Sequence, residues 1–235
     1  MIYKIFKISL TILFFNILIS QSQFSGNANF SYANRLNDGS LLKLPYRMFE
    51  LKYANESENF SLNSELAFEW NRKMDTDFLT DNNPQDFILD LRELYLTWYI
   101  PMGEIKIGKQ IHSWGFVDEN SPLDNLNALD YYYLFESGAS KKLGSYSVTS
   151  NLYWDNFTFG IIFSPFHNTN RLPIVNSKID SEFPVMIPII PNINQFIELK
   201  NKQEIGINLF YSSNIFDLCI SFFEGYDRIF NLSGI

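Results

Sequence analysis

The strongest constraint on the fold is an alternation of apolar and polar residues with a period of two, which recurs in segment after segment past residue 22. This is the pattern of β-strands that bury or face one apolar side. It is clearest over residues 60–71, where Phe, Leu and Trp alternate with Ser, Asn and Glu. Nine such segments can be counted. The sequence therefore predicts an all-β chain of antiparallel strands.

The links between these segments are long and short in turn. Antiparallel strands place odd-numbered and even-numbered links at opposite ends of a sheet, and bacterial outer-membrane barrels have long extracellular loops and short periplasmic turns. A soluble sandwich has no reason to sort its links in this way. The alternation favours an up-and-down transmembrane β-barrel, with the long links on the outer rim. The long links are 35–44, 73–86, 113–144 and 165–201, and the short ones are 55–59, 101–103, 155–156 and 213–214.

Composition supports a barrel and excludes several other classes. The chain is 17% aromatic, yet past the N-terminus it has no apolar run of the ~20 residues that a transmembrane helix needs. A net charge of −8 argues against a nucleic-acid partner. A single cysteine, Cys219, excludes an internal disulfide framework and a zinc site built on cysteines. Aromatic residues near strand ends, where barrels carry girdles, are Tyr53, Trp70, Trp98, Tyr99, Trp154 and Tyr211.

The N-terminus predicts export. Lys4 and Lys7 precede a short apolar run that ends at Ser20-Gln21-Ser22, a small-x-small site of the kind that signal peptidase cuts. We expect residues 1–22 to be a signal peptide and residues 23–235 to form a partial outer-membrane β-barrel domain. An even strand number is the rule in single-chain bacterial barrels. Nine strands therefore predict that further strands complete the barrel.

Residues 113–136 are acidic and aromatic, which is unusual for an exposed link. We expect them to fold into the lumen as a constriction loop. Lys109 and Gln110 could select solutes or could bind the backbone of the inward loop. Trp114 could anchor the loop to the wall or stack on a sugar, and the anchor is the favoured reading. Because the loop carries acids and neither Lys nor Arg, a weakly cation-selective pore is expected.

Part of the chain resembles a known family. Arg92-Glu93-Leu94-Tyr95, the strand Gly103–Gln110, Trp114-Gly115 and residues 122–130 together are similar to the porin-like outer-membrane family of alginate exporters and their uncharacterised relatives. The resemblance covers about 45 of the 235 residues. It departs at Ala128, where the family usually has proline, and in size, since those barrels have about sixteen to eighteen strands. The positions that match the motif are Arg92, Lys109, Gln110, Trp114, Asp124 and Asp130.

The resemblance and the strand pattern together predict a channel for passive passage of small polar solutes. The expected location is the outer membrane of a Gram-negative-type bacterium, with membrane lipid and a small polar solute as partners. A non-conducting structural or adhesion barrel is the alternative. We predict no enzyme activity, cofactor or metal. The predicted pore-lining residues are Arg92, Lys106, Lys109, Gln110, Trp114, Asp118, Asp124, Asn127, Asp130 and Glu136.

For two groups of residues, a structural interpretation competes with a functional one. His112 beside Ser113 suggests an outer-membrane lipid hydrolase, but neighbouring residues on a strand point to opposite faces, so the hydrolase is disfavoured. Asp118, Glu119, Asp124 and Asp130 could hold Ca²⁺, which favours oxygen ligands. Their spacing fits no calcium loop, so solvated charge is the preferred interpretation.

Overall fold

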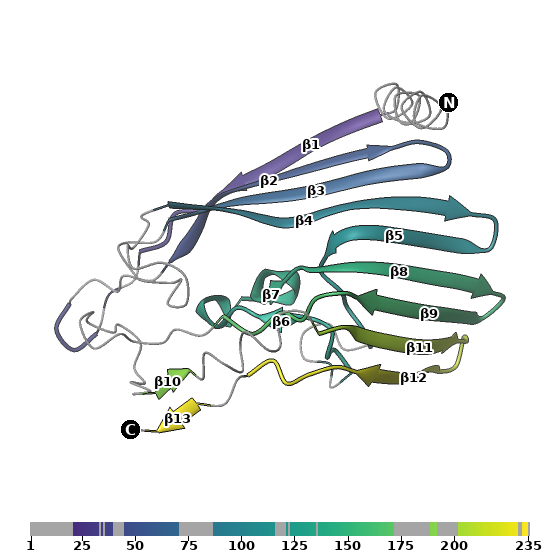
Figure 1. The fold of residues 1–235 in the computed structure, drawn as a ribbon. Coiled ribbons are helices and arrows are strands. Elements are labelled where there is room, and N and C mark those ends of the chain that lie inside the picture. The colour runs from purple at the N-terminus through teal and green to yellow at the C-terminus, as the bar shows by residue number, and fades with distance from the viewer. Residues whose placement is uncertain are drawn as a thin grey trace, which may run out of the picture.

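The fold is a curled antiparallel β-sheet (Figure 1). It is known from a computed structural model. The residues described are 21–32, 34, 36–39, 45–70, 87–115, 121, 123–134, 136–171, 189–191, 202–229 and 232–234. Within these ranges, no helix has the length and apolar character to cross a membrane. The strands of the sheet are β1 (Gln21–Ala28), β2 (Tyr46–Glu56), β3 (Phe60–Trp70), β4 (Phe87–Ile100), β5 (Gly103–Gln110), β8 (Ser145–Trp154), β9 (Phe157–Ser164), β11 (Glu204–Ser212) and β12 (Asp217–Glu224).

The spatial order of the nine described strands follows the chain, β1-β2-β3-β4-β5-β8-β9-β11-β12, and every pair is antiparallel. The predicted all-β, up-and-down topology is therefore confirmed. The sheet is open, because β1 and β12 each have one neighbour among the described strands (Figure 1). An open curled meander is consistent with part of a barrel.

Short and long links lie at opposite ends of the sheet. The turns β2–β3, β4–β5, β8–β9 and β11–β12 lie together at the right of Figure 1, whereas the link between β5 and β8 joins the opposite ends of these two strands. Two of these turns have two residues each, Pro101-Met102 and Asp155-Asn156, and Asp155 has a φ of 49°. Positive φ at such a position is typical of two-residue hairpin turns, and Asp tolerates it. These two ends are called the short-turn end and the long-link end below.

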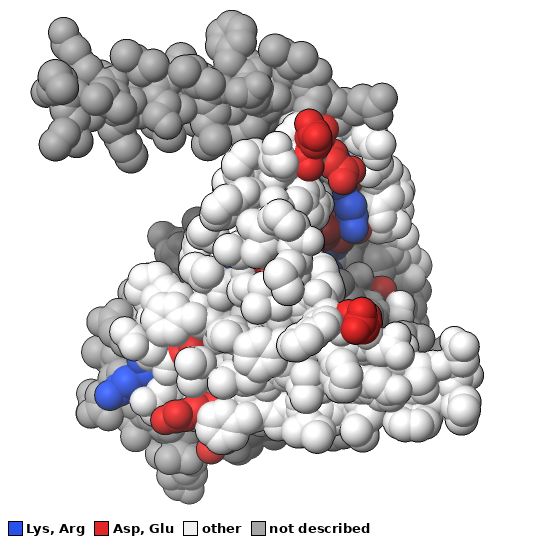
Figure 2. Space-filling model, turned by 90° about the vertical axis from the view of Figure 1, so that its right-hand side faces the viewer, with Lys and Arg blue, Asp and Glu red and all other residues white. Residues whose placement is uncertain are grey.

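The two faces of the sheet differ sharply in polarity. Strand register places Ile161 of β9 beside Ser150 and Ile207 on one face, and Gly160 beside Asn151 and Asn208 on the other. We call the first the apolar face and the second the inner face. Most visible surface at the short-turn end is uncharged (Figure 2). Exposed side chains of the apolar face include Phe49, Leu51, Leu89, Leu94, Trp98, Ile107, Val148, Leu152, Phe159, Ile161, Phe163, Leu209, Leu218, Ile220 and Phe222.

A β-bulge in β4 reverses the face of its second half. Leu66 pairs with Leu91 and Glu65 pairs with Glu93, so Arg92 is the extra residue. The interrupted alternation of residues 87–100 predicts a bulge near Arg92-Glu93, and this is confirmed. A bulge lets consecutive residues aim at one side of the strand. Through it, Glu93 and Tyr95 reach the inner face, whereas Leu89 and Leu91 lie on the apolar face.

Several short elements were not expected. β6 (Ala128–Leu129), η1 (Tyr131–Tyr133), η2 (Gly138–Lys141) and β7 (Lys142–Leu143) divide the link 113–144. β10 (Ile189–Pro191) pairs with β13 (Leu232–Gly234), and β10 lies within the long link predicted for residues 165–201. Elements of two to four residues are too short to show a period, and tertiary pairing decides them.

The predicted signal peptide, residues 1–22, lies outside the described residues up to residue 20. Gln21 and Ser22 belong to β1, where they pair with Glu56 and Asn55.

Candidate functional site

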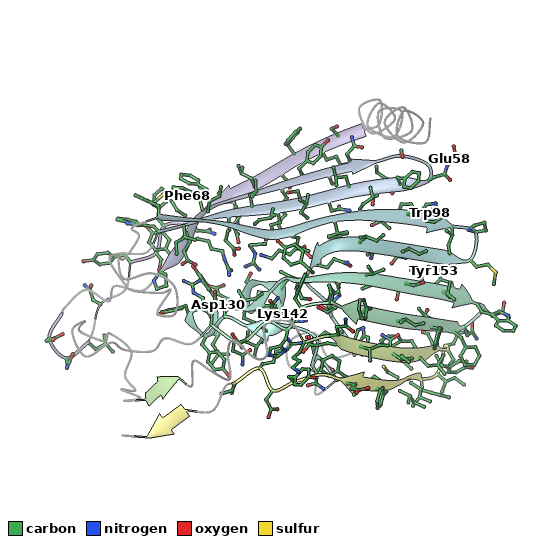
Figure 3. The ribbon with its side chains drawn as sticks, viewed as in Figure 1. Glu58, Phe68, Trp98, Asp130, Lys142 and Tyr153 are labelled. Atoms are coloured by element: carbon green, nitrogen blue, oxygen red, sulfur yellow. The ribbon has the colours of Figure 1, made fainter. Side chains whose placement is uncertain are left out.

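The link between β5 and β8 crosses the inner face of the sheet and is the centre of the candidate site. Figure 3 shows Asp130 and Lys142 on this segment, between the upper and lower strands of the view and toward the long-link end. The described residues 111–115, 121, 123–134 and 136–144 are called the crossing loop. The inward fold predicted for residues 113–136 is therefore confirmed for their described part.

A buried ionic cluster fastens the crossing loop to β2 and β3. Arg171 donates to Glu69 Oε1 at 2.6 Å, to Glu69 Oε2 at 3.1 Å and to Asp130 Oδ2 at 3.0 Å. Tyr133 donates its hydroxyl hydrogen to Glu69 Oε2 at 2.8 Å. The guanidinium of Arg47 lies 3.8 Å from the Tyr133 ring centre, within cation–π distance. We call Arg47, Glu69, Asp130, Tyr133 and Arg171 the anchor cluster.

Electrostatics in the anchor cluster depend on burial. Burial raises the pKa of Asp130, and the nearby charge of Arg171 only partly opposes this rise. Burial and the neighbouring Glu69 carboxylate raise the pKa of Tyr133, so this phenol stays protonated and donates. Burial acts to lower the pKa of Arg171, but hydrogen bonding to Glu69 outweighs it and the pKa rises. Two carboxylates thus share the Arg171 guanidinium, and removing it would leave both buried without their main partner.

Backbone carbonyls of η2 form a second attachment. Arg92, the bulge residue, donates to Ala139 O at 2.8 Å and to Glu65 Oε1 at 2.9 Å. Arg47 donates to Ser140 O at 2.7 Å. Both arginines are almost fully buried. The end of the crossing loop is therefore held by guanidinium groups from β2 and β4.

The other flank of the crossing loop packs against β9 and β11. Trp114 is buried together with Leu126 and Ile162, and Phe223 packs against this group. A methyl group added to Gly206 would lie 2.5 Å from Trp114 Cη2, so the indole ring rests directly on the glycine backbone. This contact supports the anchor role expected for Trp114. The loop thus has an ionic attachment on one side and an apolar attachment on the other.

Polar contacts within the loop fix its first turn. Asn127 accepts from the His112 backbone N–H at 2.8 Å and donates to the His112 carbonyl at 2.6 Å. Lys142 forms an ion pair with Asp124 and also donates to His112 O at 3.0 Å. Asp124 in turn accepts from Asn127 at 2.9 Å. Both backbone polar groups of His112 are therefore hydrogen-bonded, which fixes the start of the loop.

A further polar cluster ties the neighbouring links to β11. Glu204 accepts from His167 Nδ1 at 2.7 Å and from Arg228 at 2.8 Å. Arg228 also donates to the carbonyls of Leu126 at 3.0 Å and Asn168 at 2.8 Å. The crossing loop, residues 165–171 and residues 225–229 are thereby joined through one guanidinium.

A cavity of about 250 Å³ lies between the crossing loop and the inner face. Its wall comes from the middle of β4, β5, β8, β9 and β11, and residues 111–114 close it on the long-link side. Of the predicted pore-lining residues, it contains Lys106, Gln110 and Trp114. We take this cavity and the loop above it as the candidate functional site.

Lys109 and Gln110 both bind backbone carbonyls. Lys109 donates to Leu91 O at 2.5 Å, on the stretch of β4 that extends past the end of β5. Gln110 donates to Ser147 O at 3.0 Å and accepts from Thr149 at 3.2 Å. Unpaired backbone carbonyls at a split in a sheet need such donors. Both carbonyls belong to strands, β4 and β8, and not to the inward loop whose backbone was one of the two expected partners.

The remaining predicted residues are spread over the loop. Arg92, Asp124, Asn127 and Asp130 hold the loop in place, as described above. Glu136 is exposed, and Asp118 lies outside the described residues. The residues that sequence reasoning missed are Arg47, Glu69, Tyr133, Arg171, Asn208 and Arg228. Their partners lie up to 103 positions away in the sequence, and no local pattern signals such pairings.

His112 pairs with Ser147 rather than with Ser113. His112 Nε2 lies 3.0 Å from Ser147 Oγ, and both residues are more than nine-tenths buried on the inner face. A serine hydrolase needs a third group that orients the base. Among the described residues, no carboxylate contacts the other ring nitrogen of His112. The pair therefore lacks one part of a catalytic triad, and the same residues serve the packing of the loop on β8.

Protonation of His112 should weaken the protein in mild acid. Burial, with the charges of Lys106 and Lys142, lowers the pKa of His112 from 6.5 to about 4. Between these values the unfolded chain binds a proton that the folded chain does not, so the free energy of unfolding falls as pH drops from 7 to 4. The expected loss is at most about 3 kcal/mol.

The measurement is the unfolding free energy in one detergent at pH 7.5 and pH 5, for the native chain and for His112→Gln. Glutamine keeps a side chain that can bond to Ser147 but does not titrate. We expect the variant to lose less stability between the two pH values. Equal losses in both proteins would contradict the role given to His112.

No group of three or more His, Cys, Asp or Glu residues in the described part of the chain is arranged to hold a metal ion. Asp124 and Asp130 bind Lys142 and Arg171 instead. No protein-family model matches this chain, and no curated protein is similar to it at a significant level. The resemblance to alginate exporters therefore stays a sequence-based expectation.

Proposed function

We propose that this chain forms β-barrel wall in a bacterial outer membrane and lets small polar solutes pass, with residues 113–136 as the constriction. The observation that carries the proposal is the distribution of polarity over the sheet. Apolar side chains face outward, whereas charged groups and the crossing loop occupy the inner face. A water-soluble sandwich has the opposite arrangement, with apolar faces packed against each other.

The apolar face is too large to be left in water. Ile220 and Phe222 on β12 remain 63% and 60% exposed, and similar residues continue across the sheet to Leu51 on β2. Soluble monomers rarely expose contiguous apolar patches beyond a few hundred Å². Aromatic residues at the short-turn end, such as Trp98 and Trp154, fit the girdle of a membrane barrel. Lipid is the environment that this face suits.

The two free edges set a condition on the proposal. Unpaired backbone groups facing lipid cost several kcal/mol each. In a membrane, β1 and β12 must therefore be paired, either with each other or with further strands. The predicted signal over residues 1–22 would deliver the chain to the outer membrane.

The charges inside the lumen are mostly compensated. Glu65 pairs with Arg92 and Lys52, Asp124 with Lys142, and Asp130 with Arg171. The cation selectivity expected from the loop acids alone loses much of its basis, because Asp124 and Asp130 each have a positive partner. A constriction built from paired charges and neutral polar groups suits small polar solutes better than polyanions such as alginate.

Conductance in planar bilayers tests the proposal. The full chain, refolded in detergent and added to a bilayer, is expected to give discrete current steps that small sugars reduce. A protein that inserts, as judged by protease protection, but passes no current would refute the channel. It would instead support a non-conducting structural barrel, which the attachment of the crossing loop at both flanks makes the second candidate.

A further inference from the structure

The cavity beneath the crossing loop has an uneven charge balance. Two of its lining residues are charged, Glu93 from β4 and Lys106 from β5. The other polar side chains on its wall are amides, hydroxyls, the imidazole of His112 and the indole of Trp114. Whether the two charges cancel depends on the partners that each one already has.

Lys106 is already neutralised within the protein. Its ammonium lies 2.9 Å from Glu104 Oε1, and Asn151 donates to the same oxygen at 3.1 Å. Glu104 is not among the residues that line the cavity. The pair Lys106–Glu104 therefore adds a hydrogen-bond donor to the wall but little net charge.

Glu93 has no such partner. One carboxylate oxygen accepts from the Ile111 backbone N–H at 2.7 Å, which is the start of the crossing loop. Among the described residues, no Lys or Arg nitrogen lies within ion-pair distance of Glu93. Its cross-strand partner on β3 is Glu65, which is a second acid. The cavity thus carries one carboxylate that has no ion-pair partner among the described residues.

A buried acceptor on the opposite wall, like the Glu93 carboxylate, calls for a ligand that donates hydrogen bonds. Asn208 is 2% exposed and lines the cavity, and its Oδ1 atom has no hydrogen-bond partner. A methyl group on Gly160 would lie 2.2 Å from this oxygen and 3.0 Å from Asn151 Oδ1. The glycine therefore leaves space for two side-chain oxygens, and a buried oxygen without a donor is destabilising until a ligand supplies one.

The size of the cavity and its aromatic lining further restrict the class of ligand that fits. A volume of 250 Å³ is at the small end of ligand pockets and suits one sugar-sized molecule rather than a chain. Tyr95, Trp114 and Phe210 contribute aromatic surface to the wall. Aromatic faces attract organic cations as well as apolar C–H groups.

We propose that this cavity binds a small organic ammonium ion that carries hydroxyl groups, of the amino-sugar or amino-alcohol class. The ammonium group binds the Glu93 carboxylate, and hydroxyl groups donate to Asn208 Oδ1 and Asn151 Oδ1. The inference rests on the proposed function, since it names the class of solute that a lumenal site in this channel would hold.

The test uses three probes of one shape and different charge. Glucosamine, glucose and glucuronate are titrated by calorimetry at pH 6 into the full chain in detergent micelles. Glucosamine is expected to bind at least about tenfold more tightly than glucose, because a charge-assisted hydrogen bond replaces a neutral one. Glucuronate is expected to bind least. Equal binding of glucosamine and glucose would overturn the inference, as would preferred binding of glucuronate.

Two variants with opposite expected effects on glucosamine affinity locate the site. Glu93→Gln keeps the oxygen that accepts from Ile111 and removes the charge, so glucosamine binding should weaken about tenfold while glucose binding is unchanged. Lys106→Gln makes the cavity more negative and should strengthen glucosamine binding, which a misfolded variant could not do. The matched control is Glu50→Gln, an inner-face carboxylate outside the cavity, which should leave binding unchanged.

Calorimetry separates this inference from the proposed function. Glucosamine that fails to bind to a chain which conducts in bilayers would overturn the cavity site and leave the channel standing. A chain that binds glucosamine but never conducts would refute the channel. If Glu93→Gln and Glu50→Gln weaken binding equally, a general lumenal charge acts and the cavity site is wrong.

Discussion

Replacing Arg171 with methionine is expected to release the crossing loop from the sheet. Arg171 binds both Glu69 and Asp130, and each of these acidic side chains is at most 3% exposed. Removing one partner of a buried ion pair leaves an uncompensated charge and costs about 3–5 kcal/mol. Since the sheet has its own ladder of backbone bonds, the loop should detach before the strands separate.

Limited trypsin digestion and conductance measure this release. In the folded chain, Lys141 and Lys142 are buried, so cleavage after either one requires an opened loop. Arg171→Met should therefore be cut much faster there and should give larger current steps. The control is Lys52→Met, which breaks the ion pair between Lys52 and Glu65. The Lys52 side chain is 58% exposed. Exposed pairs contribute about 0–1 kcal/mol, so this variant should behave as the native chain.

A combined variant shows whether charge imbalance is the cause. Glu69→Gln, Asp130→Asn and Arg171→Met together remove the two acids and the base at once. Neutral polar groups can be buried at lower cost than unpaired charges. The combined variant should be cut more slowly than Arg171→Met alone. If it is cut equally fast, the packing of Arg171 on Tyr132 rather than its charge holds the loop.

The strands were predictable because their signal is local. A period of two marks which residues share a face, and the interruption at residues 92–93 marks the bulge. The order of strands also followed, since short turns force neighbours to pair. Residues 128–129 and 142–143, by contrast, form a two-residue pairing that exists only because the loop is folded. No periodic pattern can appear in so short a segment.

The candidate site was predictable only as a region. The aromatic and acidic composition of residues 113–136 indicated an inward loop, and Trp114 and Gln110 do line the cavity. The partners of the loop were not predictable. Glu69 meets Arg171 across 102 positions of sequence, and both residues look like ordinary lumenal or surface charges when read alone. Long-range pairing follows from the curvature of the sheet, which the alternation does not encode.

The same limit applies to counting the charges of the loop. Acids in the loop predicted cation selectivity as if each were free, but Lys142 and Arg171 neutralise Asp124 and Asp130. Glu93, which the count did not include, is the acid that lines the cavity without a cationic partner. Selectivity therefore depends on which charges are unpaired rather than on the composition of the loop.

Arginine at Ile161 is expected to destabilise the protein in a lipid bilayer and to be tolerated if the chain is soluble. Ile161 lies in the middle of β9 on the apolar face, beside Ser150 and Ile207, and is 37% exposed. On the lipid side of a barrel, Arg near the bilayer midplane costs about 2–4 kcal/mol. At a partly exposed position in water, the same change usually costs within about 0.5 kcal/mol.

The matched control places the same charge on the other face. Ser221 of β12 pairs with Asn208 and so lies on the inner face. An arginine at Ser221 would enter a polar lumen, where its head can stay hydrated, and should change stability little. Both variants are unfolded by denaturant from lipid vesicles, and their free energies of unfolding are compared. If Ile161→Arg is no less stable than Ser221→Arg, the apolar face does not contact lipid and the barrel proposal fails. A difference of several kcal/mol would assign the outer face to the membrane, because no soluble arrangement penalises an exposed arginine to that extent.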